Sequence, residues 1–320
     1  MQALLLGKEI YLFFGKYDIY GIIGVLISSI LMGIIIYRVL NISKKEQIDS
    51  YDRFINKFNL NEKTKNIIQI IIQIFLLISF YIMIAGFSAY FAQEWQVPNF
   101  IGTAIIVVLC YFIFMGNIER LMKVNTVLVP VLIISILLLI SKNMDAFELL
   151  SNTTKQSSIL NAIWDAIIYT SYNSIILIPI LIPLKKCLKQ RAHSFIIAII
   201  CTLVLIILAI SILGLILKVD IDINKVELPT VYVAGIMGKG YKIIYGMIIL
   251  VSIYTSAISA GYGFLEKYRN NKKQYKKVVI IMSVAAFFIS NLGFTTLVNL
   301  LYPIFGILGL AQMIIILKKT

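Results

Sequence analysis

Apolar segments recur along the whole chain, and most of them are long enough to cross a membrane. Ten such segments can be drawn: 1–19, 21–40, 66–92, 98–116, 125–142, 159–184, 194–218, 241–265, 277–292 and 294–317. A helix needs about 20 mainly apolar residues to span about 30 Å of hydrocarbon. The pattern lacks the short alternating strands that are typical of membrane barrels. We therefore predict an all-α, polytopic membrane protein with about ten transmembrane helices in one transmembrane domain, residues 1–320.

The chain has few residues that could catalyse a reaction or hold a metal. Its one histidine is His193, and its three cysteines, Cys110, Cys187 and Cys201, are far apart in the sequence. Metal sites and disulfide frameworks need closer or repeated ligand spacings. The chain also carries no ATP-binding motif. We expect no enzymatic activity, no metal and no cofactor, apart from a coupling ion that could be Na⁺ or H⁺.

The net charge of +14 is distributed by loop rather than spread evenly. Of the 29 basic residues, 21 fall in one set of alternate loops and tails, within 38–65, 120–123, 185–191, 267–277 and 318–319. The loops between them hold seven basic residues and seven acids: Lys16, Lys142, Lys155, Lys218, Lys225, Lys239 and Lys242, with Asp18, Glu94, Asp145, Glu148, Asp220, Asp222 and Glu227. The positive-inside rule places the basic loops in the cytoplasm. The pattern predicts a multi-pass protein of the cell membrane with both termini cytoplasmic. The charge indicates attraction to anionic lipid headgroups rather than to nucleic acid.

Segment 159–184 is long enough to span, but its middle is polar. Six consecutive side chains there can form hydrogen bonds: Tyr169, Thr170, Ser171, Tyr172, Asn173 and Ser174. Lipid cannot satisfy such groups, so they must face protein, water or a solute. We expect a broken helix whose unwound backbone binds a solute. The alternative is that the hydroxyls bond back to the preceding turn and Asn173 holds helices together.

Two shorter stretches also have regular patterns. Within 50–59, apolar residues follow a helical spacing, which predicts a short helix at the cytoplasmic interface. Within 219–240, the apolar run 228–236 is too short to span. It predicts a re-entrant or capping hairpin on the outer face.

Five short motifs, in this order along the chain, resemble those of a known family: Gly7 to Gly15, Met83 to Gly86, Tyr169 to Asn173, Tyr254 to Ala257 and Leu301 to Gly306. The family is the YkvI family of uncharacterised bacterial membrane proteins, in the amino acid–polyamine–organocation (APC) superfamily with the LeuT-type fold. The resemblance implies a 5+5 inverted repeat, with repeat one at about 1–142 and repeat two at about 159–320. It also implies a solute site between the broken first helices of the two repeats.

One feature departs from that family. Its members carry a Gly/Ala-rich stretch before the first motif, whereas this chain begins Met1-Gln2-Ala3-Leu4-Leu5-Leu6. A helix from Met1 to Phe14 extends only about 21 Å, which is less than about 30 Å of hydrocarbon. The first helix is therefore expected to be shortened. A start codon assigned late, a truncated gene and a degenerate paralogue each account for this.

Several residues are candidates for a site. Glu9 and Asp165 are acids within the membrane segments, where they could bind a cation, a proton or a basic solute group. The alternatives are that Glu9 pairs with Lys8 and that Asp165 lies near enough to the outer end to be hydrated. Gly86 could line the solute pocket or simply allow close helix packing.

The resemblance implies a further candidate site on segment 241–265. Thr255, Ser256 and Ser259 carry hydroxyls there, and sodium-coupled members of the fold bind Na⁺ with hydroxyls of this segment. The alternative is that these hydroxyls make packing contacts between helices.

These features together predict a secondary transporter that works by alternating access. Its solute would be a small polar organic molecule such as an amino acid, bound near the middle of the bilayer. The alternative is a non-transporting receptor or assembly subunit related to spore-germination permease-like proteins.

Overall fold

The computed structural model describes residues 7–17, 19–48, 51–58, 61–116, 119–141, 158–190, 192–218 and 226–318. Every regular element in these ranges is a helix, as the sequence predicts. The α-helices are α1 (Lys8–Phe14), α2 (Ile19–Lys45), α3 (Tyr51–Asn56), α4 (Glu62–Trp95), α5 (Asn99–Met115), α6 (Glu119–Ser141), α8 (Ile159–Leu181), α9 (His193–Lys218), α10 (Pro229–Ile236), α11 (Lys239–Leu265), α12 (Lys272–Ile289) and α13 (Phe294–Lys318). Short 3₁₀ helices are η2 (Gly15–Tyr17), η3 (Pro183–Cys187), η4 (Glu266–Tyr268) and η5 (Ser290–Leu292).

Seven of the described helices are long and apolar enough to cross a membrane, namely α2, α4, α8, α9, α11, α12 and α13. The apolar helices Asn99–Met115 and Val129–Ser141 are shorter. The described part of the first expected span, α1, has 7 residues. The structure therefore supports a membrane protein with several spanning helices. The number ten stays a prediction.

Helix ends follow local chemistry. α12 starts in the lysine-rich segment, five residues before the predicted span, because the side chain of Asn271 accepts a hydrogen bond from the backbone N–H of Gln274 at 3.2 Å. Gly293, with φ of 87°, separates η5 from α13 in a backbone conformation that favours glycine. The predicted boundary between segments 277–292 and 294–317 is confirmed.

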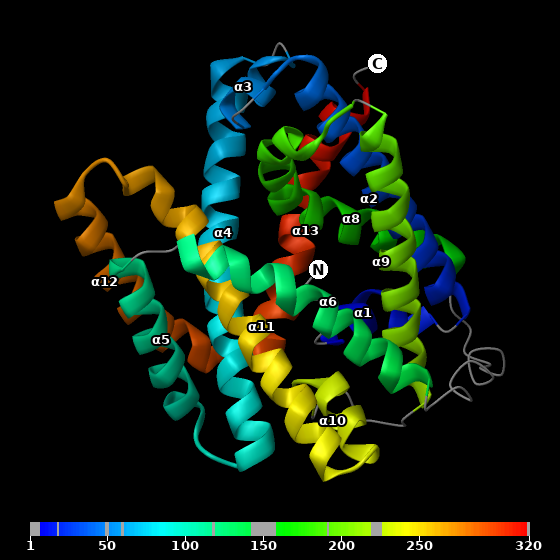
Figure 1. Ribbon diagram of the computed structural model, residues 1–320, viewed down its shortest axis with the longest axis vertical. Helices are drawn as coiled ribbons and strands as arrows, with labels where there is room; N and C mark the ends of the chain where they lie inside the picture. The colour runs from blue at the N-terminus through cyan, green and yellow to red at the C-terminus, as the bar shows by residue number, and fades with distance from the viewer. Residues whose placement is uncertain are drawn as a thin grey trace. The chain divides into compact units, whose positions relative to one another are not determined.

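Both shorter stretches form helices. α3 buries Phe54 and Ile55 at 0% and 2% exposure, so the predicted apolar side of this helix is covered by protein. In the other stretch, expected to be a hairpin, residues 229–236 form the eight-residue helix α10, which packs against α11 (Figure 1). Residues 219–225 of that stretch lie outside the described residues.

The break expected in the sixth segment is absent, because α8 is a continuous helix from Ile159 to Leu181. Its polar side chains are satisfied without unwinding the backbone. Thr170 Oγ1, Asn173 Nδ2 and Ser174 Oγ donate to carbonyl oxygens three or four residues earlier, at 2.8, 2.9 and 2.7 Å. In each of these three bonds, the side chain donates a hydrogen to a backbone carbonyl of its own helix. The prediction of unwound backbone at 169–174 was wrong.

The chain divides into two compact units that each draw on both halves of the sequence. The first unit is Met1–Gly15, Leu76–Thr153 and Ser211–Asn299, and the second is Lys16–Phe75, Thr154–Ile210 and Leu300–Thr320. Their boundaries fall inside α4, α9 and α13. They do not coincide with the two repeats that the resemblance implies. The single domain and its repeats therefore stay predictions.

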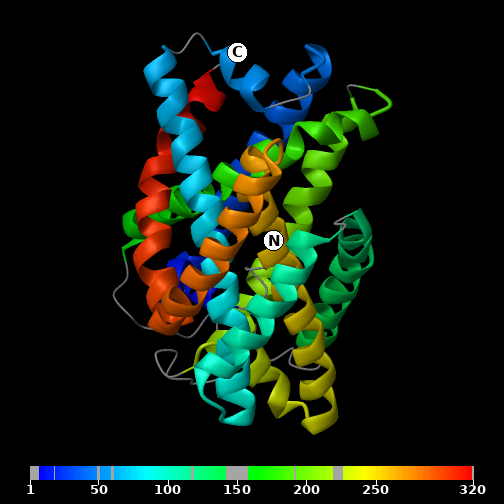
Figure 2. The same cartoon turned by 90° about the vertical axis from the view of Figure 1, so that its left-hand side faces the viewer.

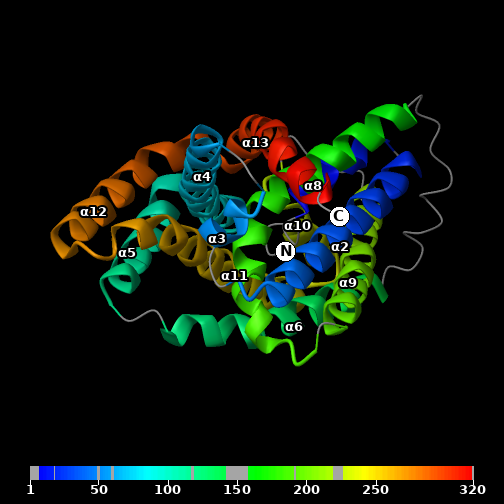
Figure 3. The same cartoon turned by 90° about the horizontal axis from the view of Figure 1, so that it is seen from above.

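Helices α5 and α12 run antiparallel to each other in the first unit (Figures 1 and 2). The Thr103 and Ser290 hydroxyl oxygens lie 3.1 Å apart, which joins the start of α5 to the end of α12. At the other end, Tyr275 Oη donates to the carbonyl oxygen of Phe114 at 2.9 Å. In the second unit, α2 packs along α8 (Figure 3).

Candidate functional site

The polar turn of α8, residues 169–174, is almost wholly buried. Tyr169, Thr170, Ser171, Tyr172 and Ser174 are at most 3% exposed, whereas Asn173 is partly exposed. Thr170 Oγ1 also lies 3.3 Å from the carbonyl oxygen of Ser28 on α2. The turn is therefore a polar patch in the interior of a predicted membrane span, and it contacts a second span of the same unit.

Helix α13 approaches this turn closely from another direction. Ser171 Oγ donates a hydrogen bond to the carbonyl oxygen of Gly306. A Cβ atom at Gly309 would lie 2.6 Å from the carbonyl oxygen of Ser171, closer than real Cβ contacts come. Small residues allow such approach between membrane helices. The glycines of α13 thus bring its backbone against the polar turn.

Aromatic rings cover the turn on the side of Tyr172. The rings of Tyr172 and Tyr302 stack with centroids 4.6 Å apart, and Tyr169 meets Tyr172 edge-on at 5.4 Å. Phe75 lies edge-on to Phe305 at 4.6 Å and 6.4 Å from the Tyr172 ring. Offset and edge-to-face pairs of this kind stabilise by about 0.5–1.5 kcal/mol each beyond their burial. The rings form an ordered wall that belongs entirely to the second unit.

Asp165 lies one turn before the polar turn and is held by two groups from η2. Its Oδ2 accepts from Lys16 Nζ at 2.7 Å and from Tyr17 Oη at 2.8 Å. Burial lowers the pKa of Lys16, but the hydrogen bond and negative charge of Asp165 outweigh it and hold that pKa above 10.5. Burial, followed by the hydrogen bond to Asp165, raises the pKa of Tyr17 above 10.0. The acid is thus stabilised by an ion pair within the second unit.

Two other predicted site residues lie in the first unit. Glu9 sits on α1 and is 2% exposed. The neighbouring Lys8 extends its Nζ to the carbonyl oxygen of Val226 at 2.9 Å. Gly86 is buried in α4, two residues before Ser88, whose Oγ donates to the carbonyl oxygen of Asn99 on α5 at 2.5 Å.

The three hydroxyls proposed for a sodium site belong to α11, in the first unit. Ser256 Oγ and Thr255 Oγ1 donate to the carbonyl oxygen of Ser252 at 2.7 and 3.1 Å, and Ser259 Oγ donates to that of Thr255 at 2.8 Å. Each hydroxyl therefore bonds to a carbonyl of its own helix. Hydroxyl oxygens bonded in this way keep lone pairs that could coordinate a cation. Among the described residues, no cluster of three His, Cys, Asp or Glu side chains is placed to hold a metal ion.

Sequence reasoning missed the partners of the α8 turn. Ser28, Tyr302 and Gly309 come from two other helices and surround it in the second unit. The pairing of Asp165 with Lys16 was also missed, although Lys16 belongs to an outer loop and the alternative interpretation of Asp165 placed it near the outer end of its segment. That shared position was the one signal in the sequence that could have indicated the pair.

Comparison with known proteins supports a membrane protein. The chain is 26% identical over 317 residues to "Uncharacterized membrane protein YkvI" of Bacillus subtilis (strain 168), which covers 95% of this chain and 88% of the relative. It is 22% identical over 316 residues to "Uncharacterized protein YyaD" of the same organism, which covers 97% of this chain and 90% of the relative. No family model matches the chain. The chain is thus similar along nearly its whole length to a membrane protein of the kind that its motifs resemble.

Proposed function

We propose that this protein is a secondary transporter of a small polar organic solute, such as an amino acid, with an APC-type architecture. The observation that carries the proposal is the buried polar turn 169–174 in a helix that is apolar enough to span a membrane. Intramembrane polar groups are costly and are kept where they serve a pathway or a site. No catalytic step and no cofactor is part of the proposal.

The order of the described helices supports the 5+5 inverted repeat. Counting α-helices alone, each half contains two helices, then a very short one, then three more: α1, α2, α3, α4, α5, α6, and then α8, α9, α10, α11, α12, α13. The short helices α3 and α10, with 6 and 8 residues, occupy the same third place. Internal repeats of this kind are typical of secondary transporters whose solute site lies near the bilayer midplane.

The hydrogen-bond pattern of the turn favours a solute that donates. Thr170, Ser171 and Ser174 each give their single hydroxyl hydrogen to a backbone carbonyl. A hydroxyl that has given its hydrogen offers only acceptor lone pairs. An ammonium, amide or hydroxyl group of the solute fits these acceptors better than a carboxylate does. Asn173, partly exposed beside them, is the member of the turn that a solute would reach first.

Contacts between helix ends support the predicted topology. In the second unit, Lys44 Nζ donates to the carbonyl oxygen of Leu188 at 2.5 Å, and both lie in stretches assigned to the cytoplasm. In the first unit, Lys242 and Glu94 form an ion pair at 2.7 Å, and both were assigned outside. Each contact joins chain ends that the charge pattern places on one side of the membrane. We therefore propose a location in the cell membrane with both termini cytoplasmic.

Uptake by reconstituted protein tests the proposal. Purified protein in liposomes is offered radiolabelled amino acids one at a time, under a pH gradient or a sodium gradient, which also separates the two coupling ions. Asn173→Ala should reduce uptake at least tenfold. Asn291→Ala is the matched control, because its Nδ2 makes the same 2.9 Å bond to the carbonyl four residues earlier, at an exposed position of the first unit. It should leave uptake unchanged.

The outcomes separate transport from reception. Equal uptake by the Asn173 and Asn291 variants would reject the site. If the solute stabilises the protein against heat but no uptake is seen, the protein is a receptor or assembly subunit rather than a transporter. Absence of both uptake and stabilisation across the amino acids would remove amino acids as the solute.

A further inference from the structure

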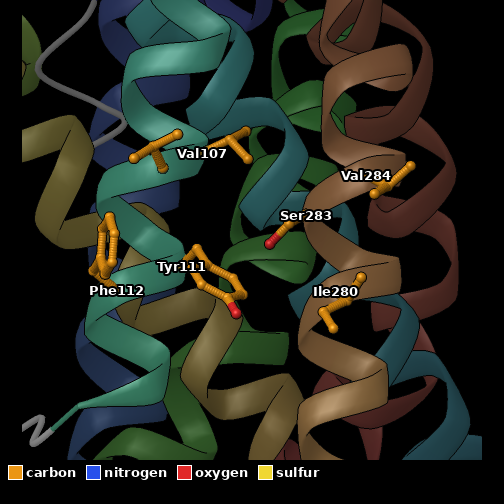
Figure 4. Close-up of a pocket in the computed structure, with 7 residues that line it drawn as sticks. Val107, Tyr111, Phe112, Ile280, Ser283 and Val284 are labelled. Carbon is orange, nitrogen blue, oxygen red and sulfur yellow. The ribbon is translucent and has the colours of Figure 1, made fainter.

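An apolar groove runs between α5 and α12 on the surface of the first unit. Its volume is about 320 Å³, at the lower end of the range of about 300–1,000 Å³ for ligand sites. The lining residues are Val107, Val108, Tyr111 and Phe112 of α5 with Ile280, Ser283 and Val284 of α12. Figure 4 shows Tyr111 and Ser283 pointing into the space between the two helices.

The groove is open to the surroundings of the protein. Phe112 is 68% exposed, Val284 55% and Ile280 50%. Their neighbours facing outward along α12 are apolar as well, including Ile281 at 56%. In a helix that is long and apolar enough to span a membrane, such a surface faces hydrocarbon. In a bilayer, the surroundings of such a groove are acyl chains rather than water.

A row of lysines continues the α12 wall of the groove toward the helix start. Lys276 and Lys277 precede Ile280 by four and three residues, so they lie on the same helix face, one turn closer to the membrane surface. Lys273 lies one turn further along the same face. The side chains of all three lysines are exposed. A lipid whose chain occupies the groove would thus have its headgroup beside these ammonium groups.

Lys273, in the first turn of α12, lies where its charge opposes the helix dipole. The first turn of α12 contains no acidic residue, although the positive end of the helix dipole disfavours cations there. The positive-inside rule accounts for lysines on this side of the membrane, but not for their alignment with the groove. A phosphate beside Lys276 and Lys277 would offset the repulsion among the three lysines of this face.

We propose that the groove between α5 and α12 binds one anionic phospholipid, with an acyl chain between Tyr111 and Ile280 and its phosphate at Lys276 and Lys277. The site belongs to the first unit alone and does not depend on the proposed transport. The hydrogen bond of Tyr275 to the Phe114 carbonyl holds the two helices together at the headgroup end. The groove is therefore a defined site rather than a general lipid-facing surface.

Native mass spectrometry of the intact protein in detergent tests the site. Phosphatidylglycerol and phosphatidylcholine with identical acyl chains are titrated separately, and the fraction of protein that retains one lipid is measured. Phosphatidylglycerol should bind more tightly. The double variant Lys276→Gln/Lys277→Gln should weaken the binding of phosphatidylglycerol by roughly 20- to 30-fold, since each lysine near an anionic membrane surface contributes roughly fivefold in affinity. Phosphatidylcholine carries the same phosphate beside a choline cation, so its binding should weaken by a smaller factor.

Two controls match the variants. Lys186→Gln/Lys189→Gln removes the same charge from exposed lysines of the second unit, on the side also assigned to the cytoplasm, and should leave binding unchanged. Val284→Trp fills the groove and should abolish retention of the first lipid. Ile281→Trp adds the same bulk at an equally exposed position that does not line the groove, and should retain it.

Equal phosphatidylglycerol affinity in both double-lysine variants would overturn the headgroup assignment. Equal retention in the two tryptophan variants would overturn the groove. A lipid-free dimer that dissociates on Val284→Trp would show a second copy of this chain in the groove instead, and would also overturn the proposal.

Discussion

Gly309 tests how closely α13 packs against the polar turn of α8. Gly309→Ala would place a methyl group 2.6 Å from the carbonyl oxygen of Ser171 and 2.8 Å from its Oγ. Ordinary contact begins at 3.4 Å, so the helices must separate by about 0.8 Å. The carbonyl belongs to the backbone of a continuous helix and cannot rotate away.

The expected loss follows from three contributions. Overpacking of a close contact costs about 1–3 kcal/mol. Separation also weakens the bond from Ser171 Oγ to the Gly306 carbonyl, worth about 0.5–1.5 kcal/mol. Alanine returns up to about 1 kcal/mol of helix propensity. The net destabilisation is about 1–3 kcal/mol, which at about 2–4 °C per kcal/mol lowers Tm by several degrees.

The assay measures Tm for a fluorescent fusion of the protein in detergent. Samples are heated, and the loss of the monodisperse peak is monitored by size-exclusion chromatography. Gly240→Ala is the matched control, because a Cβ there meets nothing within 4 Å, and its Tm should stay constant or rise. Adding Ser171→Ala to Gly309→Ala removes the hydroxyl but not the carbonyl, so it should not restore the full Tm. Equal Tm values for the two glycine variants would refute the packing of α13 on α8.

Three further outcomes follow from the charges. The pKa of Lys16 lies above its ordinary 10.5, so the stabilisation that its ion pair provides is complete below pH 10.5 and is lost as the pH rises further. Above that pH, the Tm of the unmodified protein should therefore fall more steeply than the Tm of the Asp165→Asn variant. Glu227→Gln should lower the free energy of unfolding by about 0.3–1 kcal/mol, seen as a fall in Tm. The amide oxygen can still accept the hydrogen bonds from Thr295 N and Oγ1, at 2.9 and 2.5 Å, but the negative charge beside the first turn of α13 is lost. In whole cells of a variant whose native cysteines are serine, an impermeant maleimide should label a cysteine at position 239 but not one at 272. Labelling of position 272 without permeabilisation would contradict the predicted topology.

The helices were predictable because each apolar run is bounded by charge, turn residues or glycine. α13 begins after Gly293 and ends at Lys318, within one residue of the predicted segment. α12 starts earlier than predicted, because four lysines between 272 and 277 were assigned to the loop. Asn271 caps the helix, and its exposed lysines extend out of the apolar layer. The hydropathy of the sequence locates the apolar part of a helix, whereas the capping residue determines at which residue the helix begins.

The site was predictable only in part, since its partners are distant in the sequence. The turn 169–174 was identified by composition alone. Its contacts to Ser28 and Gly306 span 142 and 135 residues, and no local pattern encodes them. The expected break in α8 was wrong because polar side chains were counted as unsatisfied, although Thr, Ser and Asn can bond to their own helix. A polar run in a membrane span predicts hydrogen bonding, not an unwound backbone.

The acid that first suggested a charged site is the weaker evidence for transport. Asp165 already has a cation, Lys16, and a phenol, Tyr17, as partners, so its place in a membrane span requires no solute. Lys16 is 52% exposed, which makes the pair modest in strength and open to exchange. A solute ammonium could take the place of Lys16 only by competing with it. In the buried turn 169–174, the hydroxyls of Thr170, Ser171 and Ser174 have given their hydrogens to backbone carbonyls and retain acceptor lone pairs, and the case for a solute therefore depends on that turn.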